Sequence, residues 1–172
     1  MAEHRTHIDE LVDYPGLVVG QLVKQPNMLE LLANKKNAGY EDLEDDKGDW
    51  KCFFDYDYIT GTLQEVGSYI CIDTDIVDVP NSSVMTLKLY VEIIVHRDIM
   101  EINRKLLPGY KGNRRDELTR YCDLALRGNR DFGIGRLVLQ SAVTFSVGNS
   151  NYTGKRLVYL VKGYSTDRSR LP

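Results

Sequence analysis

Apolar residues near the amino terminus recur at helical spacing. From Ile8 to about Lys36 they lie three or four positions apart, which places their side chains on one face of a helix. The pattern predicts two or three short helices in this segment. Pro15-Gly16 is expected to interrupt the first helix, whereas Pro26 suits a first helical turn, where its missing N–H would have had no helical partner.

Further along the chain, apolar and polar residues alternate, as in strands that bury one face. Strands are predicted from Trp50 to Tyr58, from Ser68 to Val79 and, most clearly, from Met85 to His96. Residues 137–147 and 155–164 predict two more, joined by a turn rich in glycine and asparagine. The last two strands would form a long carboxy-terminal β-hairpin.

One long helix is predicted between these strands, over residues 114–127. Asn113 can cap its first turn, and Gly128 suits the left-handed residue that commonly ends a helix. Asp116 and Glu117 lie at the positive end of the helix dipole. The apolar residues that recur on one face are Leu118, Tyr121, Cys122 and Ala125.

The order of these elements predicts an α+β fold. Helices, strands, one helix and a hairpin favour a mainly antiparallel sheet over a parallel βαβ sheet, with the amino-terminal helices and the long helix packed on one face. A length of 172 residues suits a single domain over residues 1–172. Within it we expect a helical segment (1–36), an exposed loop with six acidic side chains (37–49), and the sheet with its helix (50–172).

Composition and charge argue against several classes of protein. The net charge of -3 and the pI near 5.6 give no overall attraction to nucleic acid, so no sequence-specific nucleic-acid binding is expected. No window approaches the ~18 consecutive apolar residues of a membrane span, and no signal-peptide segment follows the polar amino terminus. Cys52, Cys71 and Cys122 are odd in number and widely spaced, which predicts reduced thiols.

Familiar catalytic motifs do not occur in the sequence, and neither a catalytic residue nor a cofactor is expected. Two Asp-x-Asp pairs could hold Mg²⁺ or Mn²⁺, because residues two apart on a strand share a face. The alternative is that they are solvated charges on strand edges. The four residues are Asp55, Asp57, Asp73 and Asp75.

Basic residues concentrate in the segment after the third strand. We predict that they contact an acidic surface on a neighbouring subunit, for which residues 37–49 of an identical chain are one candidate. The alternative is that they are solvated loop charges. The basic residues are Arg97, Arg104, Lys105, Lys111, Arg114 and Arg115.

The carboxy-terminal half resembles the neck proteins of tailed bacteriophages, in particular the tail terminators. The resemblance is carried by the strand from Leu87, by Asn113-Arg-Arg-Asp-Glu-Leu, by Phe132-Gly-Ile-Gly and by Tyr152-Thr-Gly-Lys-Arg-Leu-Val-Tyr. It implies a structural virion protein without a cofactor, assembled in the host cytoplasm. Its subunits would form a ring, usually sixfold, between the head–tail connector and the tail tube. The segment from Trp50 to Val79 departs from this pattern, because it adds two strand-like stretches.

The resemblance also implies which segments would reach neighbouring subunits. Loops and long hairpins project from a rigid sheet, so the segment from Arg97 to Asn113 and the hairpin tip from Asn149 to Thr153, with Asn151 and Tyr152 in it, are expected at contacts.

Three other functions are compatible with the sequence. A head completion or connector adaptor protein would bind the portal side. A metal-dependent phosphodiesterase would use the four aspartates. A small-ligand-binding domain would be a monomer with a deep apolar pocket.

Overall fold

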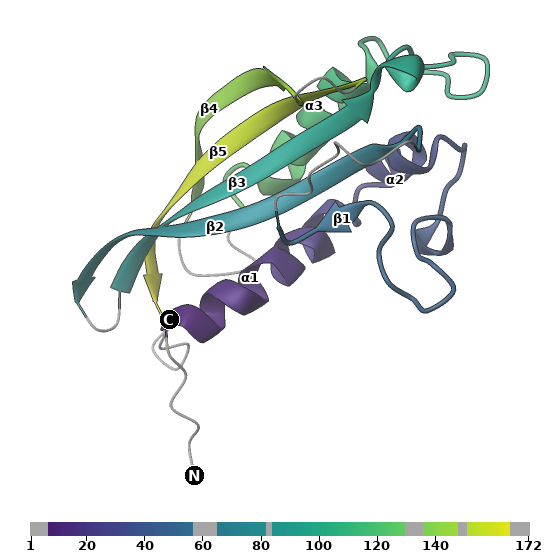
Figure 1. The fold of residues 1–172 in the computed structure, drawn as a ribbon. Helices are drawn as coiled ribbons and strands as arrows, with labels where there is room; N and C mark the ends of the chain where they lie inside the picture. Colours follow the sequence, from purple (N-terminus) through teal and green to yellow (C-terminus); the bar gives the residue numbers. More distant parts are fainter. Residues whose placement is uncertain (1–6, 57–64, 82–83, 130–135, 148–150, 166–172) are drawn as a thin grey trace.

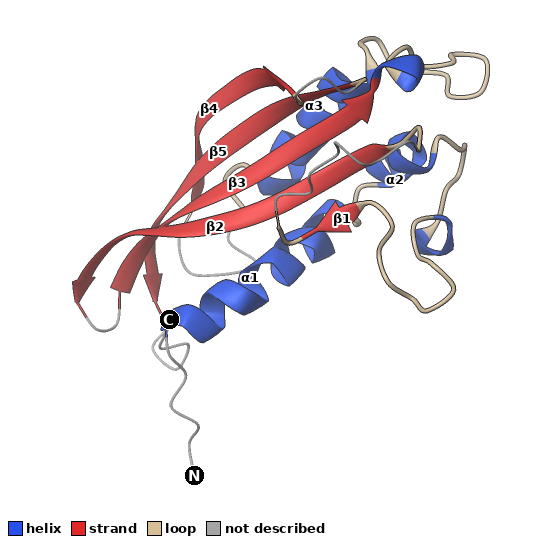
Figure 2. Cartoon of the chain, viewed as in Figure 1, coloured by secondary structure: helices blue, strands red, loops and turns tan. Residues whose placement is uncertain are grey.

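The computed structural model describes residues 7–56, 65–81, 84–129, 136–147 and 151–165 (Figure 1). Within these residues, five strands form one sheet in the order β1-β2-β3-β5-β4, accompanied by three α-helices (Figure 2). The helices are α1 (His7–Leu22), α2 (Pro26–Ala33) and α3 (Arg114–Leu126). The strands are β1 (Phe53–Phe54), β2 (Ser68–Asn81), β3 (Val84–His96), β4 (Leu137–Ser146) and β5 (Tyr152–Ser165). The predicted α+β class is confirmed.

The first helix does not break where the sequence predicted. Pro15 lies inside α1, so the expected interruption at Pro15-Gly16 is wrong. Tyr14, Val18 and Leu22 lie four residues apart and are almost completely buried in the core. Their packing outweighs the roughly 3 kcal/mol by which proline disfavours a helix interior. The presence of a proline in the sequence does not show whether its cost to the helix exceeds the stabilisation from burying the neighbouring side chains.

The sheet is antiparallel except at one edge. β2 pairs with β3, β3 with β5 and β5 with β4, all antiparallel, while β1 pairs with β2 in parallel through only two residues. The strand predicted over residues 50–58 is therefore reduced to Phe53–Phe54 within the described residues, and Asp57 lies outside them. β5 begins at Tyr152, three residues before the predicted start.

One face of the sheet packs against the helices and forms the main core. The alternating residues of β3 that were expected on one face are completely or almost completely buried there. The helices contribute apolar side chains to the same cluster. The residues of β3 are Leu87, Leu89, Val91, Ile93 and Val95, and those of the helices include Val18, Met28, Leu31, Leu118 and Cys122.

The opposite face of the sheet carries a smaller apolar cluster. Tyr69, Cys71, Ile94 and Tyr152 are buried in it, and Phe145 packs against them. The same ring also lies over Gly154 of the neighbouring strand, where an added Cβ would come within 2.3 Å of the ring. Among the described helices, none has the length and hydropathy of a membrane span.

Candidate protein–protein interface

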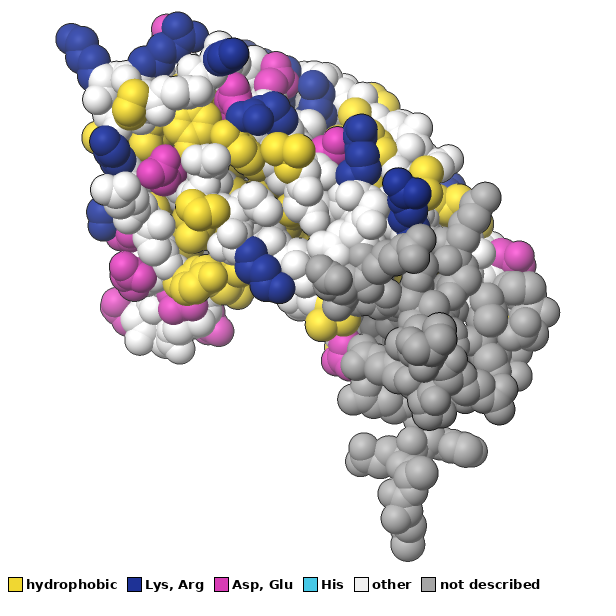
Figure 3. Space-filling model, turned by 180° about the vertical axis from the view of Figure 1, so that it is seen from behind, with side chains coloured by type: hydrophobic (Ala, Val, Ile, Leu, Met, Phe, Trp, Pro, Cys, Tyr) yellow, Lys and Arg dark blue, Asp and Glu magenta, His cyan; other side chains and the backbone are white. Residues whose placement is uncertain are grey.

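The segment between β3 and α3, residues 97–113, presents basic side chains to solvent; we call it the basic loop. Arg97, Arg104, Lys105 and Lys111 are all exposed. Leu106 lies among them and is 42% exposed. The basic loop lies at the outer end of β3 (Figure 1), and Lys and Arg side chains gather at that end of the molecule (Figure 3). The loop therefore combines positive charge with an accessible apolar side chain.

Arg114, which the sequence placed among the contact residues, is buried instead. Its side chain is 1% exposed, and its guanidinium donates to the backbone oxygen of Ile99 at 2.8 Å, to Asn34 Oδ1 at 2.6 Å and to the backbone oxygen of Leu31. Its backbone N–H donates to Met100 O at 2.8 Å. Arg114 therefore ties the start of the basic loop to the end of α2, and its side chain contributes no exposed charge.

Glu117 holds the other end of the basic loop. This buried carboxylate accepts hydrogen bonds from the backbone N–H groups of Lys111 at 3.0 Å and Gly112 at 2.9 Å. The Arg120 guanidinium donates to its second oxygen at 2.8 Å. Burial acts to raise the pKa of Glu117, but the hydrogen bonds outweigh it and the pKa lies below the ordinary value of 4.5. The ionised form is therefore the one that fixes the loop.

Two further hydrogen bonds stiffen the middle of the basic loop. The Tyr110 hydroxyl donates to the Glu30 carboxylate of α2 at 2.9 Å, and burial is the main cause of the raised pKa of this phenol. The Arg104 guanidinium donates to the backbone oxygen of Lys111 at 3.2 Å, across the loop. The basic loop is thus preorganised by contacts to α2 and α3.

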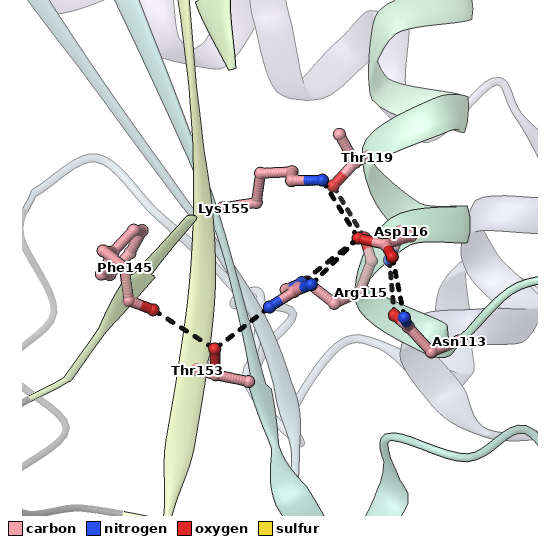
Figure 4. A network of polar contacts seen from close by, with 7 residues as sticks. All are labelled: Asn113, Arg115, Asp116, Thr119, Phe145, Thr153 and Lys155. Carbon is pink, nitrogen blue, oxygen red and sulfur yellow. Dashed lines mark hydrogen bonds and ion pairs between the residues drawn. The ribbon is translucent and has the colours of Figure 1, made fainter. Parts of the chain in front are cut away.

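A second polar network joins the start of α3 to β5 (Figure 4). Asp116 accepts hydrogen bonds from Asn113 Nδ2 at 2.7 Å and from Lys155 Nζ at 3.1 Å. Arg115 pairs with Asp116 at 3.2 Å and donates to Thr153 Oγ1, also at 3.2 Å. Burial acts to raise the pKa of Asp116, but its cationic and amide donors bring it below 3.8. The guanidinium of Arg115 is therefore bound within its own chain, and its charge is offset by Asp116.

The two predicted hairpin residues differ in their surroundings. Asn151 is exposed, and its backbone oxygen accepts a hydrogen bond from the N–H of Arg97 at 2.8 Å. Tyr152 is buried at 1% exposure, with its hydroxyl bonded to the backbone oxygen of Glu65 and its ring edge-on to His96. Only Asn151 has a side chain available to a partner. Residues 148–150 of the predicted hairpin tip lie outside the described residues.

An apolar groove between α1 and β1 was not found from the sequence. It has a volume of about 610 Å³. Gly16 and Gly20 line it on the helix side, and Trp50, Phe53 and Tyr56 line it on the other. The Trp50 and Phe53 rings meet edge to face, with centroids 5.4 Å apart. Two glycines one helical turn apart and the aromatic residues that follow Asp49 were the local signals for this groove.

Two carboxylates belong to the lining of the groove. Asp49 and Asp55 are exposed and belong to its lining. Asp45 shapes the adjoining turn by accepting hydrogen bonds from the backbone N–H groups of Lys47 at 2.8 Å and Asp49 at 2.9 Å. These bonds hold the pKa of Asp45 below 3.8. The exposed acidic loop predicted from the sequence thus borders an apolar surface.

Asp55 lines the groove beside α1, whereas Asp73 and Asp75 line a different hollow. Within the described residues, no group of three or more His, Cys, Asp or Glu side chains is arranged to hold a metal ion, and Asp57 lies outside them. Asp73 and Asp75 line a hollow of about 290 Å³ on the open face of the sheet. Its third carboxylate, Glu92, forms an ion pair with Arg156.

All three cysteine side chains are buried. Cys52, Cys71 and Cys122 form no disulfide bond with one another. Burial raises the pKa of the Cys52 thiol to about 12 and also raises that of Cys122. Thiols with such pKa values are neutral near pH 7, which removes the nucleophilic form.

A model of the YomW family matches residues 25–161, which include α2, α3 and most of the sheet. The chain belongs to the YomW family. A comparison with curated proteins gives no match.

The YomW fold also occurs in a solved structure. A chain of the structure titled "Virion of native gene transfer agent (GTA) particle" is similar with a TM-score of 0.53 and 16% sequence identity. The similarity covers 88% of this YomW chain and 94% of the other chain. It extends over nearly the whole of both chains and so shows a common fold.

Proposed function

We propose that this chain is a structural component of a phage-like virion. The observation that carries the proposal is the similarity in fold, along nearly the full length of both chains, to a protein of a gene transfer agent virion. The resemblance of the carboxy-terminal half to phage neck proteins points in the same direction. In this role the chain works through contacts with other virion proteins and has no enzymatic activity.

More specifically, we propose a tail terminator. Copies of the chain would form a ring, sixfold in the usual case, that caps the tail tube and joins it to the head–tail connector. The basic loop supports this role because it is exposed yet fixed at both ends by Arg114 and Glu117. Loops held by a rigid scaffold are common positions for binding residues.

The proposed contact surface is narrower than the set predicted from the sequence. It consists of exposed side chains at the outer end of β3 and at the start of β5. Arg114, Arg115 and Tyr152 support it from within, through their hydrogen bonds to α2, β5 and residue 65. The exposed members are Arg97, Arg104, Lys105, Lys111 and Asn151.

The test is a mass measurement on the purified chain, alone and mixed with tail tube subunits or with connector subunits. A tail terminator is expected to give a ring-sized oligomer, alone or on adding tube subunits. An unrelated protein of similar net charge serves as the control partner. Binding to connector subunits and never to tube subunits would replace the terminator role with that of a connector adaptor. A single chain per particle in every mixture would refute the structural role.

A further inference from the structure

We propose that the groove between α1 and β1 receives part of the basic loop from a second copy of this chain. The inserted part would be the corner Arg104-Lys105-Leu106, which we call the loop corner. This proposal deepens the proposed function and rests on it, because it names the contact through which copies of the chain join.

Charge favours this pairing. Asp49 and Asp55 line the groove, and the segment 41–55 to which they belong contains seven carboxylates and two lysines. Residues 97–111 of the basic loop contain four cationic side chains and two carboxylates. Figure 3 shows Asp and Glu side chains gathered at one part of the molecular surface and Lys and Arg at another. Opposite patches of this kind attract and orient two copies, whereas two like patches repel.

The shape and polarity of the groove suit the loop corner. Leu106 would enter the apolar space between the helix and Trp50, while Arg104 and Lys105 would face Asp49 and Asp55 at the rim. Arginine also stacks favourably over the face of a tryptophan or tyrosine ring. An apolar anchor surrounded by paired charges is the usual composition of the centre and rim of an interface.

The two glycines of α1 give an independent reason to expect close approach. A Cβ added at Gly16 or Gly20 would meet no atom within 4 Å. Glycine weakens a helix relative to alanine, and packing within the chain gives no compensating reason for it here. A second chain lying against this face of α1 would supply that reason.

The basic loop should lose little conformational entropy when its corner binds a second copy. The hydrogen bonds that fix it go to α2 and α3, through Glu30 and Glu117. Leu106 remains 42% exposed in the single chain. Ordering a flexible loop would weaken association, and this loop is already ordered.

Each copy carries one loop corner and one groove, so the contact is heterologous. The corner of one copy fills the groove of the next, which leaves a free corner and a free groove at the two ends of any short oligomer. Contacts of this type close into a ring when the rotation between neighbours permits. The pairing therefore accounts for a closed ring with a single kind of contact.

Two substitutions separate the two halves of the contact. Leu106→Asp places a charge on the loop corner, and Gly16→Leu places an apolar side chain in the groove from a position where an added Cβ meets no atom within 4 Å. Each is expected to raise the dissociation constant for self-association roughly 30-fold or more, as for a central interface residue. The matched controls are Leu124→Asp and Val12→Leu, at exposed positions of α3 and α1, which should leave assembly unchanged.

Mixing the two variants gives the sharpest result. The Leu106→Asp chain keeps an intact groove, and the Gly16→Leu chain keeps an intact corner, so together they form one complete contact and cannot extend it. Sedimentation velocity should therefore show a 1:1 dimer in the mixture and monomers of each variant alone. Circular dichroism melts of both variants confirm that each is folded.

The outcomes distinguish this contact from the proposed function. If the wild-type chain assembles and both variants assemble equally well, the groove–corner contact is refuted while the ring proposal stands. If both variants stay monomeric and their mixture also stays monomeric, the contact is likewise refuted. If the wild-type chain is monomeric alone and with tube subunits, the proposed function fails, and this contact fails with it.

Discussion

Replacing Arg114 with methionine should destabilise the fold far more than its position in a basic segment would indicate. The guanidinium serves two backbone carbonyls, those of Ile99 and Leu31, and the side-chain oxygen of Asn34. Methionine keeps an apolar stem in the buried site but donates no hydrogen bond. Each buried polar group left without a partner costs about 1–3 kcal/mol, and Asn34 is exposed to water, so the two backbone carbonyls alone should account for a loss of roughly 2–6 kcal/mol.

Urea denaturation followed by circular dichroism measures this loss directly. The midpoint of the transition should fall with little change in slope, and the Tm should fall by roughly 2–4 °C for each kcal/mol lost. The stability of Arg114→Lys should lie between those of the wild type and Arg114→Met, because a single ammonium group cannot reach three acceptors as a planar guanidinium does. Arg127→Met is the matched control, since Arg127 is exposed and makes one ion pair with Asp123. Equal stability of Arg114→Met and this control would refute the tethering role.

Three other substitutions test separate features of the fold. Glu117→Gln should lower the free energy of unfolding by about 1–3 kcal/mol relative to the wild type at pH 7. The lowered pKa of Glu117 means that its stabilisation is present above pH 4.5 and is lost as pH falls through the folded-state pKa, so urea titrations at pH 7 and pH 3 should show the difference shrinking. Gly128→Ala should cost about 1 kcal/mol, measured by thermal melts, because Gly128 has a φ of 70°. Gly154→Ala should cost about 1–3 kcal/mol, because its Cβ would collide with the Phe145 ring, and adding Phe145→Ala should recover part of that loss. A double variant no more stable than Gly154→Ala would argue against the collision.

Strand β3 and helix α3 could be predicted because several local signals agree there. The alternation of β3 places one set of apolar residues on the core, and its bounds, Val84–His96, differ from the prediction by one residue at the start. Asn113 caps α3 as expected, with its side-chain oxygen accepting the Asp116 N–H at 2.9 Å. Short-range hydrogen bonds and periodic burial can both be recognised from the residue types at fixed spacings in a sequence.

The joint at Pro15 and the length of β1 could not be predicted in the same way. Whether a proline interrupts a helix depends on what the neighbouring turns bury, and Tyr14 and Val18 bury their side chains in a core assembled from distant segments. β1 exists through a parallel pairing of Phe53 with Ile70 and Phe54 with Cys71. A pairing so short adds no periodic pattern to the sequence.

The basic surface was predicted in part. Exposure of Arg97, Arg104 and Lys105 follows from their place in a polar segment. Arg114 was misplaced on that surface, although its position four residues before Leu118, a core residue of α3, puts both side chains on the same helix face. The groove lined by Gly16 was missed because it is created by two segments that only the fold brings together.

The proposed function requires that copies of this chain assemble into a ring that caps a tail tube. Electron microscopy of tube protein assembled with and without the purified chain tests it most directly. The prediction is a closed ring of this chain at one end of each tube, and no further growth of the tube from that end. Tubes that stay bare and grow equally with and without the chain would contradict it.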